Sequence, residues 1–110
     1  MDYLDRTMLH GNAETLVLAI LADRDCHGYE LRKELAARSN EYFQFAFGRL
    51  YPLLQSLERR GLVTMRRTKS RLNRECREYA LTGKGANALR DRKRKWQQFA
   101  AAMNQVLSRT

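Results

Sequence analysis

The sequence predicts a mainly α-helical domain that carries a two-stranded β-hairpin and ends in a long helix. Three observations predict this fold class. Residues 47–60 place leucines at i, i+3, i+4 and i+7, the spacing of an amphipathic helix. Residues 62–67 and 76–81 are short segments with partial alternation and β-branched or aromatic side chains, as in paired strands. Residues 83–108 alternate apolar steps of three and four, as in a helix that packs along a seam.

The composition indicates a single domain with a polyanionic partner. The chain has 110 residues, of which 44% are hydrophobic, enough for a modest core. Its 21 Lys and Arg residues against 12 Asp and Glu residues give a formal net charge of +9. This balance favours nucleic acid first and an anionic membrane second, although many small basic proteins bind nucleic acid only adventitiously.

The sequence gives little sign of a membrane, a metal or a disulfide. It has no apolar run of the roughly 20 residues that span a bilayer, and residues 1–12 lack the pattern of a signal peptide, so we expect a cytoplasmic protein. Cys26 and Cys76 have no CxxC spacing. We expect free thiols and no cofactor or metal, while a redox switch between the two cysteines stays open.

The first part of the chain predicts two helices. Residues 1–11 indicate a weak helical turn or arm, and Asn12 is the expected N-cap of a helix over residues 13–22. That helix is apolar on nearly every side, so either its own domain or a second subunit must cover it. A second helix is expected over residues 28–38, with Tyr29, Leu31, Leu35 and Ala36 facing inward.

The flanks of the second helix have structural roles. His27 stands at the cap position, where we expect a hydrogen-bonded histidine rather than a metal ligand, because Cys26 beside it supplies at most one further ligand. Residues 39–46 form a connector with three aromatic side chains, Tyr42, Phe43 and Phe45. We expect these aromatics to plug the core beneath the connector.

The third helix, over residues 47–60, is predicted to be apolar behind and basic in front. Its leucines are Leu50, Leu53, Leu54 and Leu57. The opposite face carries Gly48, Pro52, Gln55, Ser56 and Arg59, flanked by Arg49 and Tyr51. Gly61 ends the helix, because a residue without a Cβ adopts the left-handed conformation at low cost. Such a helix fits a major groove, which is about 12 Å wide, but by pattern alone it could equally be an ordinary surface helix.

The hairpin that follows has a basic tip at residues 68–75, with Ser70 and Asn73 as turn formers. Six cations fall within twelve residues: Arg66, Arg67, Lys69, Arg71, Arg74 and Arg77. They repel one another unless a polyanion lies against them. Basic loops are often merely solvated, but this one adjoins a basic helix.

The last helix, over residues 83–108 with Thr82 as its N-cap, is too long for a small core. Its seam comprises Ala86, Leu89, Lys93, Trp96, Ala100, Met103 and Leu107. At 1.5 Å per residue it extends for about 39 Å. We expect it to lie against another copy of itself or of the first helix, the alternative being a long helix packed within one monomer.

These elements together predict a winged helix-turn-helix, in which one helix reads the major groove and the hairpin reaches the flanking backbone. Residues 12–81 would form the DNA-binding part of a single domain over residues 1–110. Residues 82–110 would form a C-terminal dimerisation helix, to which residues 1–22 contribute.

The residues also resemble a known family. The segments HGYEL, LYPLL with LERRGL, and YALTGKG closely resemble the PadR-like transcriptional regulators in sequence and spacing, over residues 9–108. The length is similar to the short branch of that family, which ends in one dimerising helix. The resemblance implies a homodimeric repressor, with a small molecule as any effector. The wing tip TKSRLNRECR departs from the family because it lacks the usual glycines.

The expected DNA contacts follow from the charges and the symmetry. A two-fold dimer would bind an inverted repeat with half-sites about 10 base pairs apart. We expect base contacts from Arg49, Gln55, Ser56 and Arg59 on the recognition helix, and mainly phosphate contacts from Tyr51, Arg66, Arg67, Lys69, Arg71 and Arg74. The expected dimer contacts are Leu16, Ile20, Leu89, Trp96, Ala100, Met103 and Leu107.

Trp96, the only tryptophan, lies on the seam of the last helix. Its two copies in a dimer could wall a cleft for a flat aromatic or cationic effector, which would act by tilting the long helices; the alternative is plain interface packing. An enzyme is disfavoured, because the sequence has no nucleophile with a base, no phosphate loop, and only His10 and His27 for acid–base work. A winged-helix module that coats DNA nonspecifically or binds a protein remains the alternative function.

Overall fold

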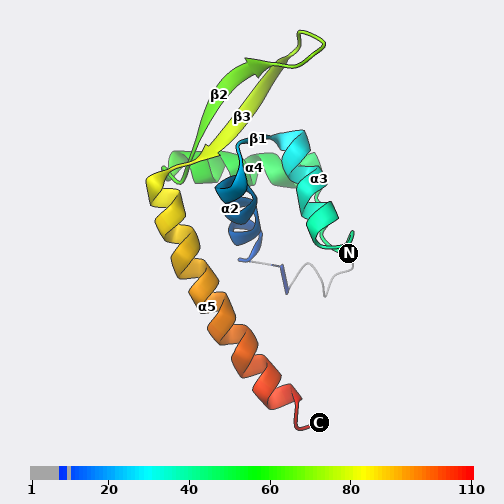
Figure 1. Cartoon of the computed structure of the whole chain (residues 1–110), viewed down its shortest axis with the longest axis vertical. Helices are drawn as coiled ribbons and strands as arrows, with labels where there is room; N and C mark the ends of the chain where they lie inside the picture. Colours follow the sequence, from blue (N-terminus) through cyan, green and yellow to red (C-terminus); the bar gives the residue numbers. More distant parts are fainter. Residues whose placement is uncertain (1–7, 10) are drawn as a thin grey trace.

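The computed structural model describes residues 8–9 and 11–110, and it has the predicted winged helix-turn-helix with a long last helix. The elements are α2 (Ala13–Asp23), β1 (Cys26–His27), α3 (Gly28–Arg38), α4 (Phe47–Arg59), β2 (Val63–Lys69), β3 (Glu75–Leu81) and α5 (Gly83–Leu107). Figure 1 shows α2 between α3 and α5, while the β2–β3 hairpin and α5 start close together at one side of the helical body and extend in opposite directions. The arm expected over residues 1–11 falls mostly outside the described residues.

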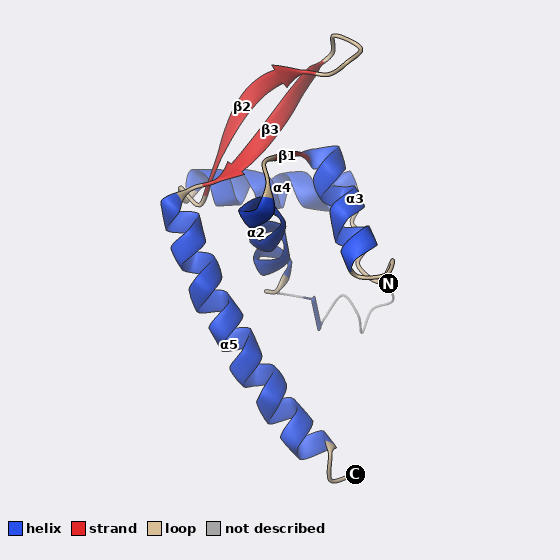
Figure 2. Ribbon diagram, viewed as in Figure 1, coloured by secondary structure: helices blue, strands red, loops and turns tan. Residues whose placement is uncertain are grey.

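The sheet has three strands, not the two that were predicted. Its order is β1-β3-β2, and both pairings are antiparallel (Figure 2). Residues 26 and 27 of the supposed polar break pair with Tyr79 and Glu78. The sequence pattern missed β1 because two residues are too few to display an alternation. This short strand joins the wing to the start of α3.

The core lies where the helices and the base of the wing meet. Leu50, Leu54 and Leu57 of α4 are fully buried, as the leucine spacing predicts. The connector is confirmed as a core plug in part: Phe45 is buried and Phe43 packs against the core, but Tyr42 is exposed. The core therefore fixes the back of α4 and leaves its front free.

Two helix ends are confirmed and one is corrected. Gly61 ends α4 at a φ of +76°, in the left-handed region. The Thr82 side chain caps α5 by accepting from the Gly85 N–H at 3.0 Å. Asn12 occupies the N-cap position of α2, but its side chain donates to the Met8 carbonyl at 3.0 Å instead of accepting from the helix.

The expectation that Tyr29 faces inward is wrong. Its side chain is 60% exposed, whereas Leu31 and Leu35 are buried. Successive helical residues are 100° apart, so Tyr29 lies about 160° from Leu31 around α3. The tyrosine therefore projects from the side of α3 that faces away from the core.

Candidate nucleic-acid interface

The exposed face of α4 is the centre of the candidate interface. Gln55 and Arg59 are exposed and Ser56 is half-buried, on the side opposite the buried leucines. Gly48 has no side chain and lies at an open position, where a Cβ would meet nothing within 4 Å. The helix therefore presents a slim polar surface, as its sequence predicts.

The structure places Tyr51 and Gln55 on the flank of α4 that faces the wing. Both line a hollow of about 490 Å³ with the start of α3 and the strand β3. The other residues that line it are His27, Gly28, Tyr29, Phe47, Glu75, Cys76 and Arg77. Helix, wing and α3 thus share one concave surface.

Arg49 lies on the other flank of α4. Its guanidinium carbon is 5.7 Å from the centroid of the Phe45 ring, and it lines a separate hollow with Glu14, Pro52 and Arg92. The structure therefore does not bring Arg49 together with Gln55.

The strand register divides the cations of the wing between two faces. Arg67 pairs with Arg77 and Lys69 pairs with Glu75, so these side chains share the face that carries the buried Tyr79. Arg66 points to the opposite face, where its Nη2 lies 2.5 Å from Oε1 of Glu78. Arg66 is thus occupied by an ion pair, whereas the described contacts include none for Arg67, Lys69, Arg71 or Arg74.

The wing tip is a defined turn despite its lack of glycine. Asn73 adopts a positive φ of 59°, and its N–H donates to the Ser70 carbonyl at 2.9 Å. Asparagine tolerates this conformation better than most residues. The turn formers expected from the sequence are confirmed, and Arg71 and Arg74 are exposed at the tip.

Two residues that line this surface, Tyr29 and Arg77, were not among the predicted DNA contacts, and neither were Arg32 and Lys33, which line an adjoining hollow with Tyr29. Lys33 Nζ lies 5.6 Å from the centroid of the Tyr29 ring, and the Arg32 guanidinium carbon lies 5.1 Å from that of Phe47. Arg77 lines the hollow between α4 and the wing. The i, i+2 alternation within β3 places Arg77 on the face of Tyr79, but grouping it with Arg67 requires the register of β2 and β3. The contribution of α3 requires its placement beside α4.

His27 holds the start of α3 to the wing and is confirmed as a hydrogen-bonded residue. Its Nδ1 lies 2.8 Å from Oε1 of Glu30, and its Nε2 lies 2.8 Å from Oγ1 of Thr68 on β2. The Glu30 carboxylate also accepts from the His27 backbone N–H, and this bond lowers the pKa of Glu30. The histidine thereby fixes the base of the wing against the helix-turn-helix.

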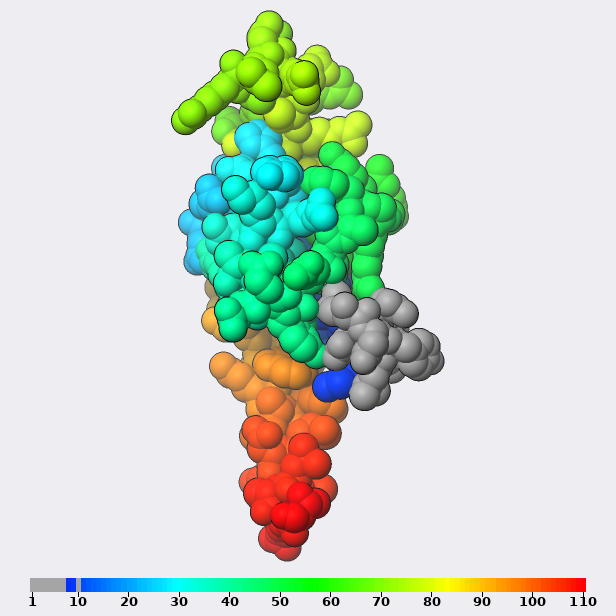
Figure 3. All heavy atoms as spheres, turned by 90° about the vertical axis from the view of Figure 1, so that its right-hand side faces the viewer, coloured from blue at the N-terminus to red at the C-terminus, as the bar shows by residue number. Residues whose placement is uncertain are grey.

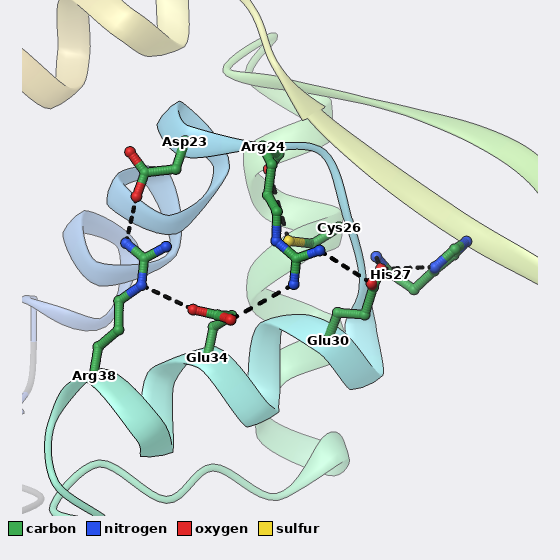
Figure 4. A network of polar contacts seen from close by, with 7 residues as sticks. All are labelled: Asp23, Arg24, Cys26, His27, Glu30, Glu34 and Arg38. Atoms are coloured by element: carbon green, nitrogen blue, oxygen red, sulfur yellow. Dashed lines mark hydrogen bonds and ion pairs between the residues drawn. The ribbon is translucent and has the colours of Figure 1, made fainter.

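Several acidic side chains are neutralised on the side where α2 meets α3 (Figure 4). Arg38 Nη1 lies 2.5 Å from the Asp23 carboxylate and Nε lies 2.9 Å from that of Glu34. Hydrogen bonds from Arg38 to these carboxylates raise its pKa. Arg24 contacts Glu30 and Glu34. Asp23, Glu30 and Glu34 therefore each have a cationic partner among these arginines.

The outer half of α5 carries an exposed apolar stripe. Trp96 is 48% exposed and Phe99 is 58% exposed, and their ring centroids are 5.9 Å apart. Met103, Val106 and Leu107 continue the stripe. Figure 3 shows this end of α5, in orange and red, as a stem that projects from the body of the chain. Phe99 and Val106 were absent from the predicted seam because strict a and d spacing is narrower than the apolar band of a helix.

The remaining predicted dimer residues lie nearer the core. Ile20 is 4% exposed and Leu89 is 7% exposed within one chain, and Leu16 packs against the same core. The burial of Ile20 and Leu89 therefore requires no second subunit. Leu16 and Trp96 line an apolar hollow of about 270 Å³ with Met8, Leu9, Asn12, Thr15, Tyr42 and Phe43.

The two cysteines cannot pair with each other in this structure. Cys26 on β1 pairs with Tyr79 on β3. Tyr79 is three residues from Cys76, a separation of roughly 10 Å along the strand. A disulfide requires Cα atoms within about 7 Å. Burial raises the pKa of the Cys26 thiol.

Over residues 8–9 and 11–110, no group of three or more His, Cys, Asp or Glu side chains could hold a metal ion. Within the same residues, no helix is long and apolar enough to cross a membrane.

Comparisons with known proteins agree with this arrangement. The chain is 32% identical over 82 residues to the transcriptional regulator YqjI of Escherichia coli, an alignment that covers 74% of this chain and 38% of that protein. It is also 29% identical over 56 residues to an uncharacterised protein of Lysinibacillus sphaericus, 51% of each chain. The chain thus spans about half the length, or less, of these two relatives.

Solved structures share the fold over most of the chain. A PadR-like transcriptional regulator of Bacillus cereus matches with a TM-score of 0.80 and 28% identity, covering 92% of this chain and 96% of that one. Bacillus subtilis PadR, solved in complex with operator DNA, matches in fold with a TM-score of 0.65 and 24% identity, covering 71% and 44%. The model of the transcriptional regulator PadR-like family matches residues 17–91, from within α2 into α5. The chain therefore belongs to the PadR-like family of transcriptional regulators.

Proposed function

We propose that this chain is a homodimer that binds an inverted-repeat DNA operator and represses transcription from it. The observation that carries the proposal is the exposed face of α4, which continues into the concave surface shared with the wing and α3. A helix of this width fits a major groove of about 12 Å. Membership of a family of transcriptional regulators supports the same function, as does the operator complex of Bacillus subtilis PadR.

The residues on the front of α4 would read base edges. Gln55 can form two hydrogen bonds to adenine, Arg59 can form two to guanine, and Ser56 can bond to either base. Arg49, on the other flank, would approach the opposite groove wall. Tyr51 faces the wing, where its hydroxyl would donate to a phosphate.

The wing would bind the DNA backbone with the cations that its register turns toward α4. Arg67, Lys69 and Arg77 share one face, and Arg71 and Arg74 extend from the tip. Phosphate contacts of this kind position a protein without specifying a sequence. Arg66 would contribute less than the others, because it must leave Glu78 before it can meet a phosphate.

The outer half of α5 would form the dimer interface. An exposed stripe of five large apolar side chains on one helix marks an association surface. Two copies related by a two-fold axis would place two recognition helices on successive half-sites, about 10 base pairs apart.

An effector would bind beside Trp96. The hollow that Trp96 lines with Leu16 and Phe43 is nearly all apolar, which suits a flat aromatic or cationic molecule. Simple packing of Trp96 against a second subunit is the competing role. Planar compounds that quench the Trp96 fluorescence should bind the wild type in calorimetry and fail to bind Trp96→Ala, while the dimer persists. Absence of binding to the wild type would leave packing as the role of Trp96.

Selection of bound fragments from random DNA tests the central proposal. We expect a palindromic consensus, together with a preference of about a thousandfold or more over unrelated competitor DNA. Recovery of fragments without any consensus, and with equal competition by unrelated DNA, would instead support a protein that coats DNA nonspecifically.

Arg71→Ala tests the role of the wing. Loss of one phosphate contact should weaken binding to all DNA sequences alike and reduce the slope of log K against log salt by about one unit. Arg66→Ala is the matched control, since Arg66 is paired with Glu78, and it should change the slope less. An unchanged slope in Arg71→Ala would remove the wing tip from the interface.

A further inference from the structure

A single carboxylate joins three parts of the chain at the junction between the winged helix and α5. Glu14, in the first turn of α2, accepts from Arg92 Nη1 on α5 at 2.8 Å. Its other oxygen accepts from Arg60, the residue that follows α4. The partners lie 78 and 46 residues away in sequence. Glu14 therefore ties α2 both to the end of the recognition helix and to the long helix.

The surroundings of Glu14 keep its carboxylate charged. Partial burial raises its pKa, but the hydrogen bonds and charges of Arg60 and Arg92 outweigh burial and lower the pKa overall. About a quarter of the Glu14 side chain is exposed, as is a similar share of Arg92. A charge in such a site interacts more strongly than an ion pair at an open surface.

The Arg92 contact differs in position from the other polar contacts at this junction. The Thr82 hydroxyl donates to the Gly61 carbonyl at 2.7 Å, and Lys84 Nζ donates to the Arg60 carbonyl at 2.9 Å. These two contacts fix the point at which α5 begins. Arg92 lies about 12 Å farther along the helix than Lys84, so its bond to Glu14 restrains the direction of α5.

The direction of α5 has a large effect at its far end. The 25 residues of α5 extend for about 37 Å, so a rotation of about 10° at the first turn moves the last turn by about 6 Å. Successive base pairs are separated by about 3.4 Å, so this shift corresponds to roughly two base pairs. In a dimer held by the outer half of α5, the distance between the two recognition helices would depend on the angle between α5 and the winged helix.

We propose that Glu14 is a positioning residue that sets the angle between α5 and the recognition helix, and thereby selects the half-site spacing that the dimer accepts. This inference rests on the proposed function and adds to it the residue that determines spacing specificity. Because Glu14 acts through Arg60 and Arg92, it would contact no DNA itself.

Operators of varied spacing provide the first test. Affinities of the wild type, Glu14→Gln and Asp91→Asn are measured for inverted repeats whose central spacer changes by one base pair at a time. We expect Glu14→Gln to lower the preference for the best spacer over its neighbours at least fivefold. Asp91→Asn should keep the wild-type profile, because Asp91 pairs only with Arg94 and Lys95 of its own helix in the described contacts.

The pairing with Arg92 sharpens this test. If the two residues act as one unit, the double variant Glu14→Gln with Arg92→Gln should flatten the spacing profile no further than either single variant. A Glu14→Gln protein that loses affinity equally at every spacing would show a merely structural role and would overturn the inference.

A measurement without DNA separates the inference from the proposed function. Spin labels at Thr64 on β2 and Gln105 on α5 report the direction of α5 relative to the winged helix. The labels are introduced in a Cys76→Ser background, and the labelled protein is diluted with unlabelled protein. We expect a narrow distance distribution in the wild type and a broader one in Glu14→Gln. Identical distributions would overturn the inference. A broadened distribution, in a protein whose wild type prefers no inverted repeat, would uphold the role of Glu14 in the angle and refute the proposed function.

Discussion

The two halves of α5 have the same secondary structure and opposite surroundings. In the first half, Gly85 and Leu89 are buried, and Thr82 caps the helix while it bonds to the turn after α4. In the second half, Trp96, Phe99 and the apolar residues beyond them are exposed. The first half is therefore part of the winged-helix core, whereas the second half presents apolar surface that is exposed among the described residues.

This difference explains how one helix can serve two purposes. The first turns need close contact, and Gly85 provides it by allowing the backbone of α5 to approach Leu62. The outer turns need side-chain area, and large apolar residues spaced three and four apart provide it. Under the proposed function, the first half transmits the position of the second subunit to the recognition helix.

The largest expected effect is on folding stability, at the close contact between Gly85 of α5 and the backbone of Leu62. A Cβ at Gly85 would lie 2.0 Å from the Leu62 carbonyl oxygen, whereas one at Gly83 would meet nothing within 4 Å. Gly85→Ala should lower the free energy of unfolding by about 3 kcal/mol or more, because the obstacle is backbone and cannot rotate away. Gly83→Ala is the matched control. Equal urea midpoints for the two variants would refute the close contact.

In the second half we expect a loss of association rather than of folding. Met103→Glu puts a charge on the apolar stripe and should raise the dimer dissociation constant about a hundredfold or more, while the circular dichroism of the chain persists. Gln98→Glu adds the same charge on the opposite side of α5 and should leave the constant within about threefold. If both variants dissociate alike, net charge and not the stripe would control association.

The smallest expected effect is at Glu14, which bonds to Arg92 near the middle of α5. The pKa of Glu14 lies below its ordinary value of 4.5, so its stabilisation is present above pH 4.5 and is lost as the pH falls through the lowered value. Glu14→Gln should cost about 1 kcal/mol of unfolding free energy at pH 7. Denaturant titrations at pH 7 and pH 3 should show this difference shrinking in acid. A difference of the same size at both pH values would contradict the ion pairs.

Much of the fold could be predicted because its elements are long and periodic. The leucines of α4 fixed its buried face, and Gly61 and Thr82 marked its end and the start of α5. The strand β1 could not be predicted, because a two-residue strand carries no pattern and forms only where β3 offers a free edge. The inward orientation expected for Tyr29 was wrong, because the prediction considered only that the side chain is largely apolar and neglected its position around the axis of α3.

The candidate site was predictable in composition but not in grouping. The exposed residues of α4 and the cations of the wing were identifiable from the sequence alone. The pairing of Arg66 with Glu78 depends on the register of β2 and β3, and the separation of Arg49 from Gln55 depends on which flank of α4 the wing covers. Such relations arise between elements, where spacing within one element gives no information.

Sedimentation equilibrium of the wild-type chain tests most directly the proposal that a second copy covers the outer half of α5. We expect a mass of twice 12.9 kDa at micromolar concentration, with dissociation promoted by Met103→Glu. A mass of 12.9 kDa for the wild type under the same conditions would contradict the account.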